Sequence, residues 1–190
     1  MKLLHLAAVL ALGVAAPSVV FAVTCPAVGD ATAGCDITIT VTNSGTTIAA
    51  GPSAGLAGGT YDGSDDTLIG IQNNSSTALS SIHLNSTLDI FGFDGDGIDA
   101  YGVTGNGSDS TGYGGPDSYF TGINGTYTSG TVDFVTALAA NGGMTYFSLE
   151  NALQPSQVTT GVTPEPSTLL MFGTGILGLA GGLRRRFFNR

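Results

Sequence analysis

The stretch 80–90, SSIHLNSTLDI, carries the clearest structural pattern in the chain. Apolar side chains stand at positions 82, 84, 88 and 90, and every odd position between them is polar. Successive side chains of a β-strand point to opposite faces of the sheet. The alternation therefore predicts a strand with one buried face and one face toward solvent.

Similar runs occur before and after this stretch. Ile37, Ile39 and Val41 alternate with threonines. Further short runs cover residues 67–71, 89–93, 118–123, 130–135 and 144–150. Glycine makes up about a sixth of residues 23–163 and serine with threonine about a quarter, which disfavours helices and favours turns. We predict an all-β fold, an antiparallel β-sandwich of about six to eight strands, with loops at 43–60, 102–116 and 141–143.

Charge divides the chain into a middle and two ends. The 5 basic residues all lie at the ends, whereas all of the 14 acidic residues except Glu165 lie between Asp30 and Glu150. A body with such a field repels phosphate, which argues against nucleic acid and anionic membrane surfaces as partners. Nucleotide chemistry is disfavoured too, because no side-chain cation is available to hold a phosphate.

Residues 1–22 have the pattern of a secretory signal peptide. Lys2 precedes an apolar run over 3–16, and Pro17 separates this run from the exit Val20-Phe21-Ala22. We predict cleavage after Ala22. The alternative is an N-terminal membrane anchor.

The C-terminal end combines an extended motif, an apolar run and a basic cluster. Pro164-Glu165-Pro166 comes first, residues 168–183 are apolar or small, and Arg184, Arg185 and Arg186 follow. A helix over 168–183 would be about 24 Å long, and the arginines would extend its reach to the cytoplasmic side. This order resembles the PEP-CTERM sorting tail. The resemblance implies that an exosortase, a membrane-embedded processing enzyme, cuts near the motif and moves the body to a further acceptor. The alternative is a single-pass membrane stalk.

These ends define the expected domain organisation. Residues 1–22 form the signal peptide and residues 23–150 the β-sandwich ectodomain. The Gln/Pro/Thr-rich residues 151–163 are expected to form a flexible linker. Residues 164–190 form the sorting tail, with its transmembrane helix at 168–183.

Cys25 and Cys35 are the only cysteines of the chain. In an exported protein, two cysteines most simply form a disulfide, which would stabilise a small body with a modest core. A metal pair or a catalytic thiol would need histidines or further cysteines nearby. We therefore predict a Cys25–Cys35 disulfide.

Two glycine-rich segments concentrate carboxylates. FGFDGDGIDAYG contains Asp94, Asp96 and Asp99, and YDGSDDT contains Asp62, Asp65 and Asp66. Such spacing allows several oxygens to fold around one hard cation, and Ca²⁺ suits an exported body without side-chain cations. The alternative is turn chemistry alone, in which Asp caps its own backbone and Gly supplies positive φ. Both remain open at this point.

The runs YDGSDDT, TALSSIHL, FGFDGDGIDAYG, GYGGP, GTVDF and GGMTYFSLE also resemble a group of uncharacterised exported bacterial ectodomains that often carry the same sorting tail. This resemblance covers roughly residues 60–150. It implies a secreted β-rich domain and supplies no catalytic residues.

The functional expectation is a non-enzymatic structural protein of the cell surface or extracellular matrix that sits in exopolysaccharide or at the cell envelope. His83 is the only histidine of residues 23–163, and a Ser-His-Asp arrangement with Asp89 lacks the nucleophile-elbow pattern. One alternative is a Ca²⁺-dependent, lectin-like adhesin that uses loop tyrosines. An ice-binding face built on the threonines between positions 38 and 42 and a hydrolase are weaker alternatives.

Overall fold

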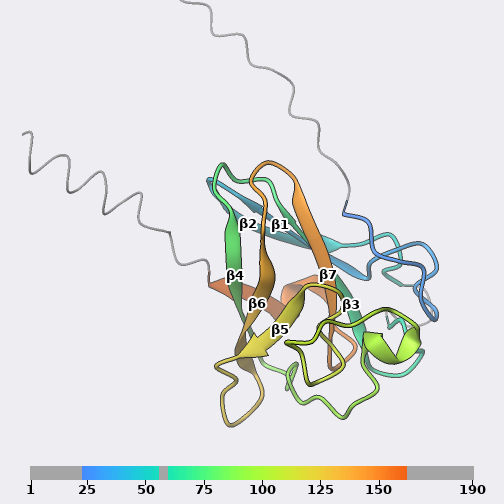
Figure 1. Cartoon of the computed structure of the whole chain (residues 1–190). Coiled ribbons are helices and arrows are strands. Elements are labelled where there is room, and N and C mark those ends of the chain that lie inside the picture. Colours follow the sequence, from blue (N-terminus) through green and yellow to red (C-terminus); the bar gives the residue numbers. More distant parts are fainter. Residues whose placement is uncertain (1–22, 56–59, 162–190) are drawn as a thin grey trace, which may run out of the picture.

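In the part of the chain that the structure describes, eight strands form two four-stranded sheets (Figure 1). The computed structural model describes residues 23–55 and 60–161. The first sheet has the order β2(Gly45–Ala50), β1(Ile37–Thr42), β3(Thr67–Asn73), β7(Gly143–Leu149). The second has the order β5(Ser118–Thr121), β6(Ser129–Leu138), β4(Leu79–Ser86), β8(Val158–Gly161). The all-β prediction is confirmed.

Helical structure in the described residues is limited to two 3₁₀ turns. These are η1(Ile98–Tyr101) and η2(Pro155–Gln157). Within residues 23–55 and 60–161, no helix reaches the length and hydropathy that a bilayer crossing requires. The predicted signal peptide, the Pro164-Glu165-Pro166 motif, the transmembrane helix at 168–183 and the arginine cluster lie outside the described residues.

The sheets are not purely antiparallel. β1 runs parallel to β3, with Ile37 opposite Ile69 and Ile39 opposite Ile71, whereas the other strand pairs are antiparallel. The predicted antiparallel sandwich is wrong at this pair. The connection from β1 to β3 contains β2 and a long loop, so the chain has enough length to return and run beside β1 in the same direction.

β2 lies inside the segment that the sequence predicts to be loop. Its residues are mostly exposed, and only Ile48 is a sizeable apolar side chain that contacts the core. It pairs along the edge of β1 from Thr42–Gly45 to Ile37–Ala50. A solvated edge strand of glycine, threonine and alanine carries almost no alternation, which is why the pattern gave no signal there.

The strand at 80–90 is confirmed in its first half. β4 covers Leu79–Ser86 with Ile82 and Leu84 buried. It ends where the Ser86 hydroxyl accepts a hydrogen bond from the Leu88 amide at 3.0 Å. This local hydrogen bond competes with the sheet ladder. The predicted strand at 89–93 is therefore absent, although Ile90 stays buried in the core.

The main core fills the space between the two sheets. Its fully buried members include Ile39, Ile71 and Phe147 from the first sheet and Leu84 and Val132 from the second. β3 is buried along its whole length, because its second face is covered by the N-terminal segment and the disulfide. A second cluster forms there around Leu68 and Tyr61.

Residues 151–161 belong to the sandwich, so the predicted linker at 151–163 is wrong over this part. β8 pairs with β4, and Leu153 and Val158 are buried in the main core. The Leu153 amide donates to Thr67 Oγ1 at 2.8 Å, and Thr67 Oγ1 donates to the Asn151 carbonyl at 2.7 Å. Leu153 and Val158 are isolated apolar residues in a polar stretch and give no periodic pattern. The strand is therefore recognised only when its partner β4 is known.

Candidate metal centre

Two carboxylates meet at one end of the first sheet. Asp66 directly precedes β3 and Glu150 directly follows β7. The register places Thr67 opposite Leu149, so the flanking acids are neighbours. Asp65, Asp66 and Glu150 each offer one carboxylate oxygen, and these oxygens lie within 4.8 Å of one another. Asp66 and Glu150 are buried and Asp65 is exposed; we call these three residues the carboxylate cluster.

The Tyr113 hydroxyl connects the carboxylate cluster to the glycine-rich loop. It lies 2.8 Å from Glu150 Oε2, 2.9 Å from Asp96 Oδ1 and 3.2 Å from Asp94 Oδ1. A hydroxyl has one proton to donate, so it cannot neutralise three carboxylate oxygens at once. Burial and these acidic neighbours raise the pKa of Tyr113 well above its ordinary value, so it stays a neutral donor.

Asp66 is the most deeply buried acid of the carboxylate cluster, with 0% of its surface exposed. Its Oδ2 accepts a hydrogen bond from the Tyr61 hydroxyl at 2.8 Å. Its Oδ1 is buried and has no hydrogen-bond partner. Burial raises the pKa of Asp66 to about 8, and the charge of Glu150 is the strongest of the neighbouring carboxylate charges that act in the same direction.

The six aspartates predicted as calcium ligands do not all lie at one site in the structure. Asp62 accepts hydrogen bonds from the backbone amides of Ser64, Asp65 and Asp66 at 3.1, 3.3 and 3.0 Å. It therefore shapes the turn that presents the next two acids, which is the turn chemistry named as the alternative.

Asp99 faces a different environment from the carboxylate cluster. Its carboxylate lies against Gly105, where an added Cβ would collide with it. Burial raises the pKa of Asp99, and the charge of Asp109 adds to the effect. Asp65 and Asp66 thus lie in the carboxylate cluster, Asp94 and Asp96 adjoin it through Tyr113, and Asp62 and Asp99 have other contacts.

Sequence reasoning missed Glu150 and Tyr113. Glu150 directly follows a strand and lies outside the glycine-rich segments, and Tyr113 lies in a loop that its Gly and Pro residues predict. The pairing of β3 with β7 places Glu150 beside Asp66. The loop that contains Tyr113 is held against β7, where the Ser148 amide donates to the Tyr113 carbonyl at 2.8 Å. A local pattern contains no information on such pairings.

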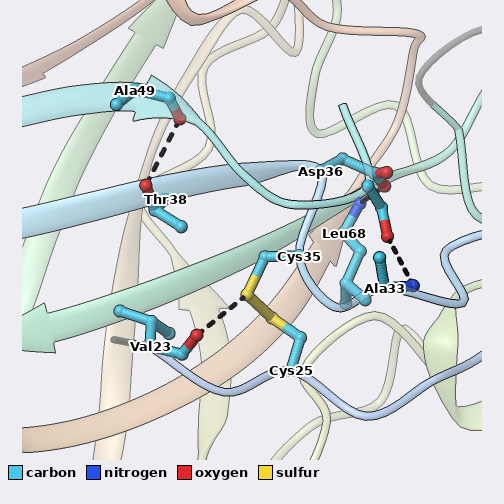
Figure 2. Close-up of a disulfide and its surroundings, with 9 residues drawn as sticks. Val23, Cys25, Ala33, Cys35, Asp36, Thr38, Ala49 and Leu68 are labelled. Carbon is cyan, nitrogen blue, oxygen red and sulfur yellow. Dashed lines mark hydrogen bonds between the residues drawn. A yellow bond between two sulfur atoms is a disulfide. The ribbon is translucent and has the colours of Figure 1, made fainter. Parts of the chain in front are cut away.

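The predicted disulfide is confirmed between Cys25 and Cys35 (Figure 2). Both cysteines are buried and belong to the second cluster, which covers the outer face of β3. Gly70 of β3 lies directly beneath them. The bridge thus attaches the start of the described chain to the segment just before β1 and packs it against β3.

Asp36 follows Cys35, directly precedes β1 and is buried beside Leu68 of β3 (Figure 2). Its Oδ2 accepts the Leu68 amide at 2.8 Å, while its Oδ1 is buried without a hydrogen-bond partner. Burial raises the pKa of Asp36 to about 6, and the charge of Asp62 contributes in the same direction.

We expect Asp36 to make the fold less stable as pH rises from about 4 to 6. Its native pKa of about 6 exceeds its ordinary value of 3.8, so the native state holds a proton that the unfolded state releases. The stability that this proton contributes is complete below the unfolded pKa and is lost as pH rises through the native pKa.

Asp36→Asn removes this titration and should gain about 2–3 kcal/mol relative to wild type between pH 4 and pH 7. Thermal melts of both proteins across this pH range measure the gain. A difference in melting temperature that stays constant with pH would contradict the assignment.

His83 contacts hydroxyl groups on the neighbouring strand. Its Nε2 lies 3.1 Å from Ser129 Oγ and its Nδ1 lies 3.2 Å from Thr131 Oγ1. Both ring nitrogens are therefore occupied by β6 hydroxyls. Asp89 accepts a hydrogen bond from the Asn151 side chain at 2.9 Å. His83 and Asp89 thus hydrogen-bond to different partners, and neither of these contacts joins them in the Ser-His-Asp arrangement that the sequence already disfavoured.

A pocket of about 600 Å³ adjoins the glycine-rich loop. Its lining includes aromatic and acidic side chains: Phe91, Phe93, Tyr127, Asp89 and Asp94. Tyr127 is 53% exposed and has a φ of 57°, a backbone conformation that is uncommon for a residue other than glycine. Asp94 borders both this pocket and the Tyr113 hydroxyl, so the pocket and the carboxylate cluster share one loop.

Comparison with known proteins finds a family match for the C-terminal segment alone. Residues 162–186 match the family model of the PEP-CTERM protein-sorting motif. No curated protein and no solved structure matches the chain. The match contains Pro164, Glu165 and Pro166 together with the arginine cluster, as the sequence resemblance predicts. The chain therefore carries a PEP-CTERM sorting signal, which implies an exported, exosortase-sorted surface protein.

Proposed function

We propose that the sandwich is a structural protein of the extracellular matrix, held in exopolysaccharide, with no catalysis of its own. The observation that carries this proposal is the position of the sorting motif. β8 ends at Gly161 and the matched motif begins at residue 162, so the signal directly follows the last strand of the fold. In this proposal a signal peptide exports the chain, the tail holds the precursor in the membrane, and the sandwich is the cargo that remains after processing.

The charge of the body supports a matrix role. Residues 23–163 contain no Lys or Arg, and their acids give a surface that repels polyanions. Such a body suits a hydrated polysaccharide that is neutral or bridged by cations. The disulfide supports the same role, because it persists in the oxidising environment outside the cell.

A Ca²⁺-dependent carbohydrate-binding adhesin is the second candidate. The pocket beside Tyr127 supports it, because aromatic rings and carboxylate acceptors are the groups that contact sugar rings and sugar hydroxyls. An ice-binding face has less support. The Thr38 hydroxyl donates to the Ala49 carbonyl at 3.4 Å and the Thr42 hydroxyl to the Gly45 carbonyl at 2.9 Å, so both are engaged with the neighbouring strand β2.

Replacement of the sorting triplet should abolish delivery to the surface. We expect the full chain, expressed in a host with an exosortase, to yield a trimmed, oxidised product in the matrix fraction. Pro164→Ala/Glu165→Ala/Pro166→Ala should leave untrimmed chain in the membrane fraction, because the proline-fixed extended backbone that a processing enzyme binds is lost. Immunoblots of the fractions measure this distribution.

Ser167→Ala is the matched control, since it changes the residue next to the triplet and should be sorted as wild type. Wild-type chain found reduced and uncut in the cytoplasm would overturn the proposal. Release of the trimmed protein from the matrix by soluble polysaccharide would favour the adhesin over the structural role.

A further inference from the structure

We propose that Asp65, Asp66 and Glu150 bind one Ca²⁺ ion, and that Asp94 and Asp96 face this ion from the neighbouring loop. The site differs from a loop of consecutive ligands, because its two buried members come from the ends of two paired strands. It is independent of the role of the protein at the surface.

The spacing of the oxygens fits the ion. Ca²⁺ binds oxygens at about 2.3–2.6 Å, so ligands on opposite sides of it are about 5 Å apart at most. The three oxygens of the carboxylate cluster lie within 4.8 Å of one another. This spacing is close to what one shared ion requires, and small rotations of the carboxylate side chains would bring all three oxygens into its coordination range.

A separate observation concerns the hydrogen bonding of Asp66. Asp66 is fully buried, and its Oδ1 has no hydrogen-bond partner. Because Tyr61 already occupies Oδ2 at 2.8 Å, Oδ1 is the atom left for another ligand. A buried, unsatisfied carboxylate oxygen is costly, and coordination by a cation removes that cost.

The charge around the carboxylate cluster points to the same ligand. Glu150 and Asp96 act on Asp66 as like charges, and Asp94 and Asp65 act on Glu150 in the same way. Residues 23–163 hold no Lys or Arg that could offset them. Oxygen-only ligands of high negative charge select a hard divalent cation over a transition metal.

The strands and turns hold the ligands in place before an ion binds. The Asp62 carboxylate accepts the amides of Asp65 and Asp66, and the Glu150 amide donates to the Ile90 carbonyl at 3.1 Å. The Asp66 carbonyl in turn accepts the Tyr61 amide at 3.0 Å. An ion bound here would also attract Asp94 and Asp96, since their Oδ1 atoms and Glu150 Oε2 all lie within 3.2 Å of the same Tyr113 hydroxyl.

The test is calcium binding by the full chain, purified in mild detergent with its disulfide formed and freed of metal with a chelator. Isothermal titration should give one ion per chain with a Kd of about 10⁻⁴ to 10⁻³ M, the range of many extracellular sites. Addition of 10 mM CaCl₂ should raise the melting temperature by about 4–10 °C. NaCl at matched ionic strength should produce a much smaller shift, because it only screens the acidic surface.

Asp65→Asn is the decisive variant, because Asp65 is exposed and its replacement leaves the buried packing intact. It should weaken Ca²⁺ binding at least tenfold while the metal-free melting temperature stays near that of wild type. Asp133→Asn, a half-buried residue of β6 in the other sheet, is the matched control and should bind as wild type.

Three results would overturn the proposal. The first is no heat and no melting shift at 10 mM CaCl₂ for wild type. The second is a NaCl shift equal to the CaCl₂ shift. The third is unchanged binding in Asp65→Asn.

Discussion

The variant Cys25→Ala/Cys35→Ala should melt about 10 °C below wild type. The bridge joins residues with a sequence separation of 10, and closing a loop of that size stabilises a fold by roughly 3 kcal/mol through the unfolded state. For a domain of this size, each kcal/mol corresponds to about 3–5 °C. The two sulfurs also fill the second cluster against β3, so their loss removes buried contacts as well.

Circular dichroism melts with and without a reducing agent test this expectation. Reduction should lower the melting temperature of wild type toward that of the variant and leave the variant unchanged. Equal melting temperatures for oxidised wild type and the variant would contradict a stabilising role for the bridge.

Gly70→Ala should destabilise the sandwich by about 2–3 kcal/mol, a typical cost of overpacking a rigid site. A Cβ at this position would lie 2.5 Å from Val23 Cγ1 and 3.0 Å from Cys25 Sγ, and it would collide with Cys35 Sγ. The disulfide is fixed at both Cys25 and Cys35, so its sulfurs cannot rotate away from the new methyl group. Urea unfolding measures the free-energy difference.

The same substitution should cost much less in the Cys25→Ala/Cys35→Ala background, because both sulfur contacts are gone. A double-mutant cycle should therefore give a coupling energy above about 1 kcal/mol. Gly125→Ala is the control, since its Cβ would meet nothing within 4 Å, and it should change stability by less than about 0.5 kcal/mol. Additive effects of Gly70→Ala and the cysteine replacements would refute the contact.

The strands that the period-two alternation predicts are those with one buried face. β1, β4 and β6 alternate between core and solvent, and their side chains repeat with period two. β2 and β8 lie at the edges of their sheets, where few side chains are buried, and their sequences resemble loops. β3 is buried on both faces, so its apolar run predicted a strand but not the parallel partner or the cover on its outer face.

The sequence predicts the acidic turns of the candidate site, but it does not predict which of the acids come together. The spacing of Asp62, Asp65 and Asp66 correctly indicated a tight turn, but which acids face a common point depends on the strands around them. Asp62 uses its oxygens on backbone amides, whereas Asp66 keeps one oxygen free. Glu150 directly follows β7, and only the register of β3 with β7 brings it beside Asp66.

The pairing of β8 with β4 determines how this domain responds to tension. Any tether joined after Gly161 pulls first on a four-residue edge strand, whose contacts to β4 run from Ser86–Val158 to His83–Gly161. We expect load to break these contacts before the two sheets separate, so that residues 151–161 extend first. The covalent bridge at the opposite end of the chain keeps the N-terminal segment fastened to the first sheet meanwhile.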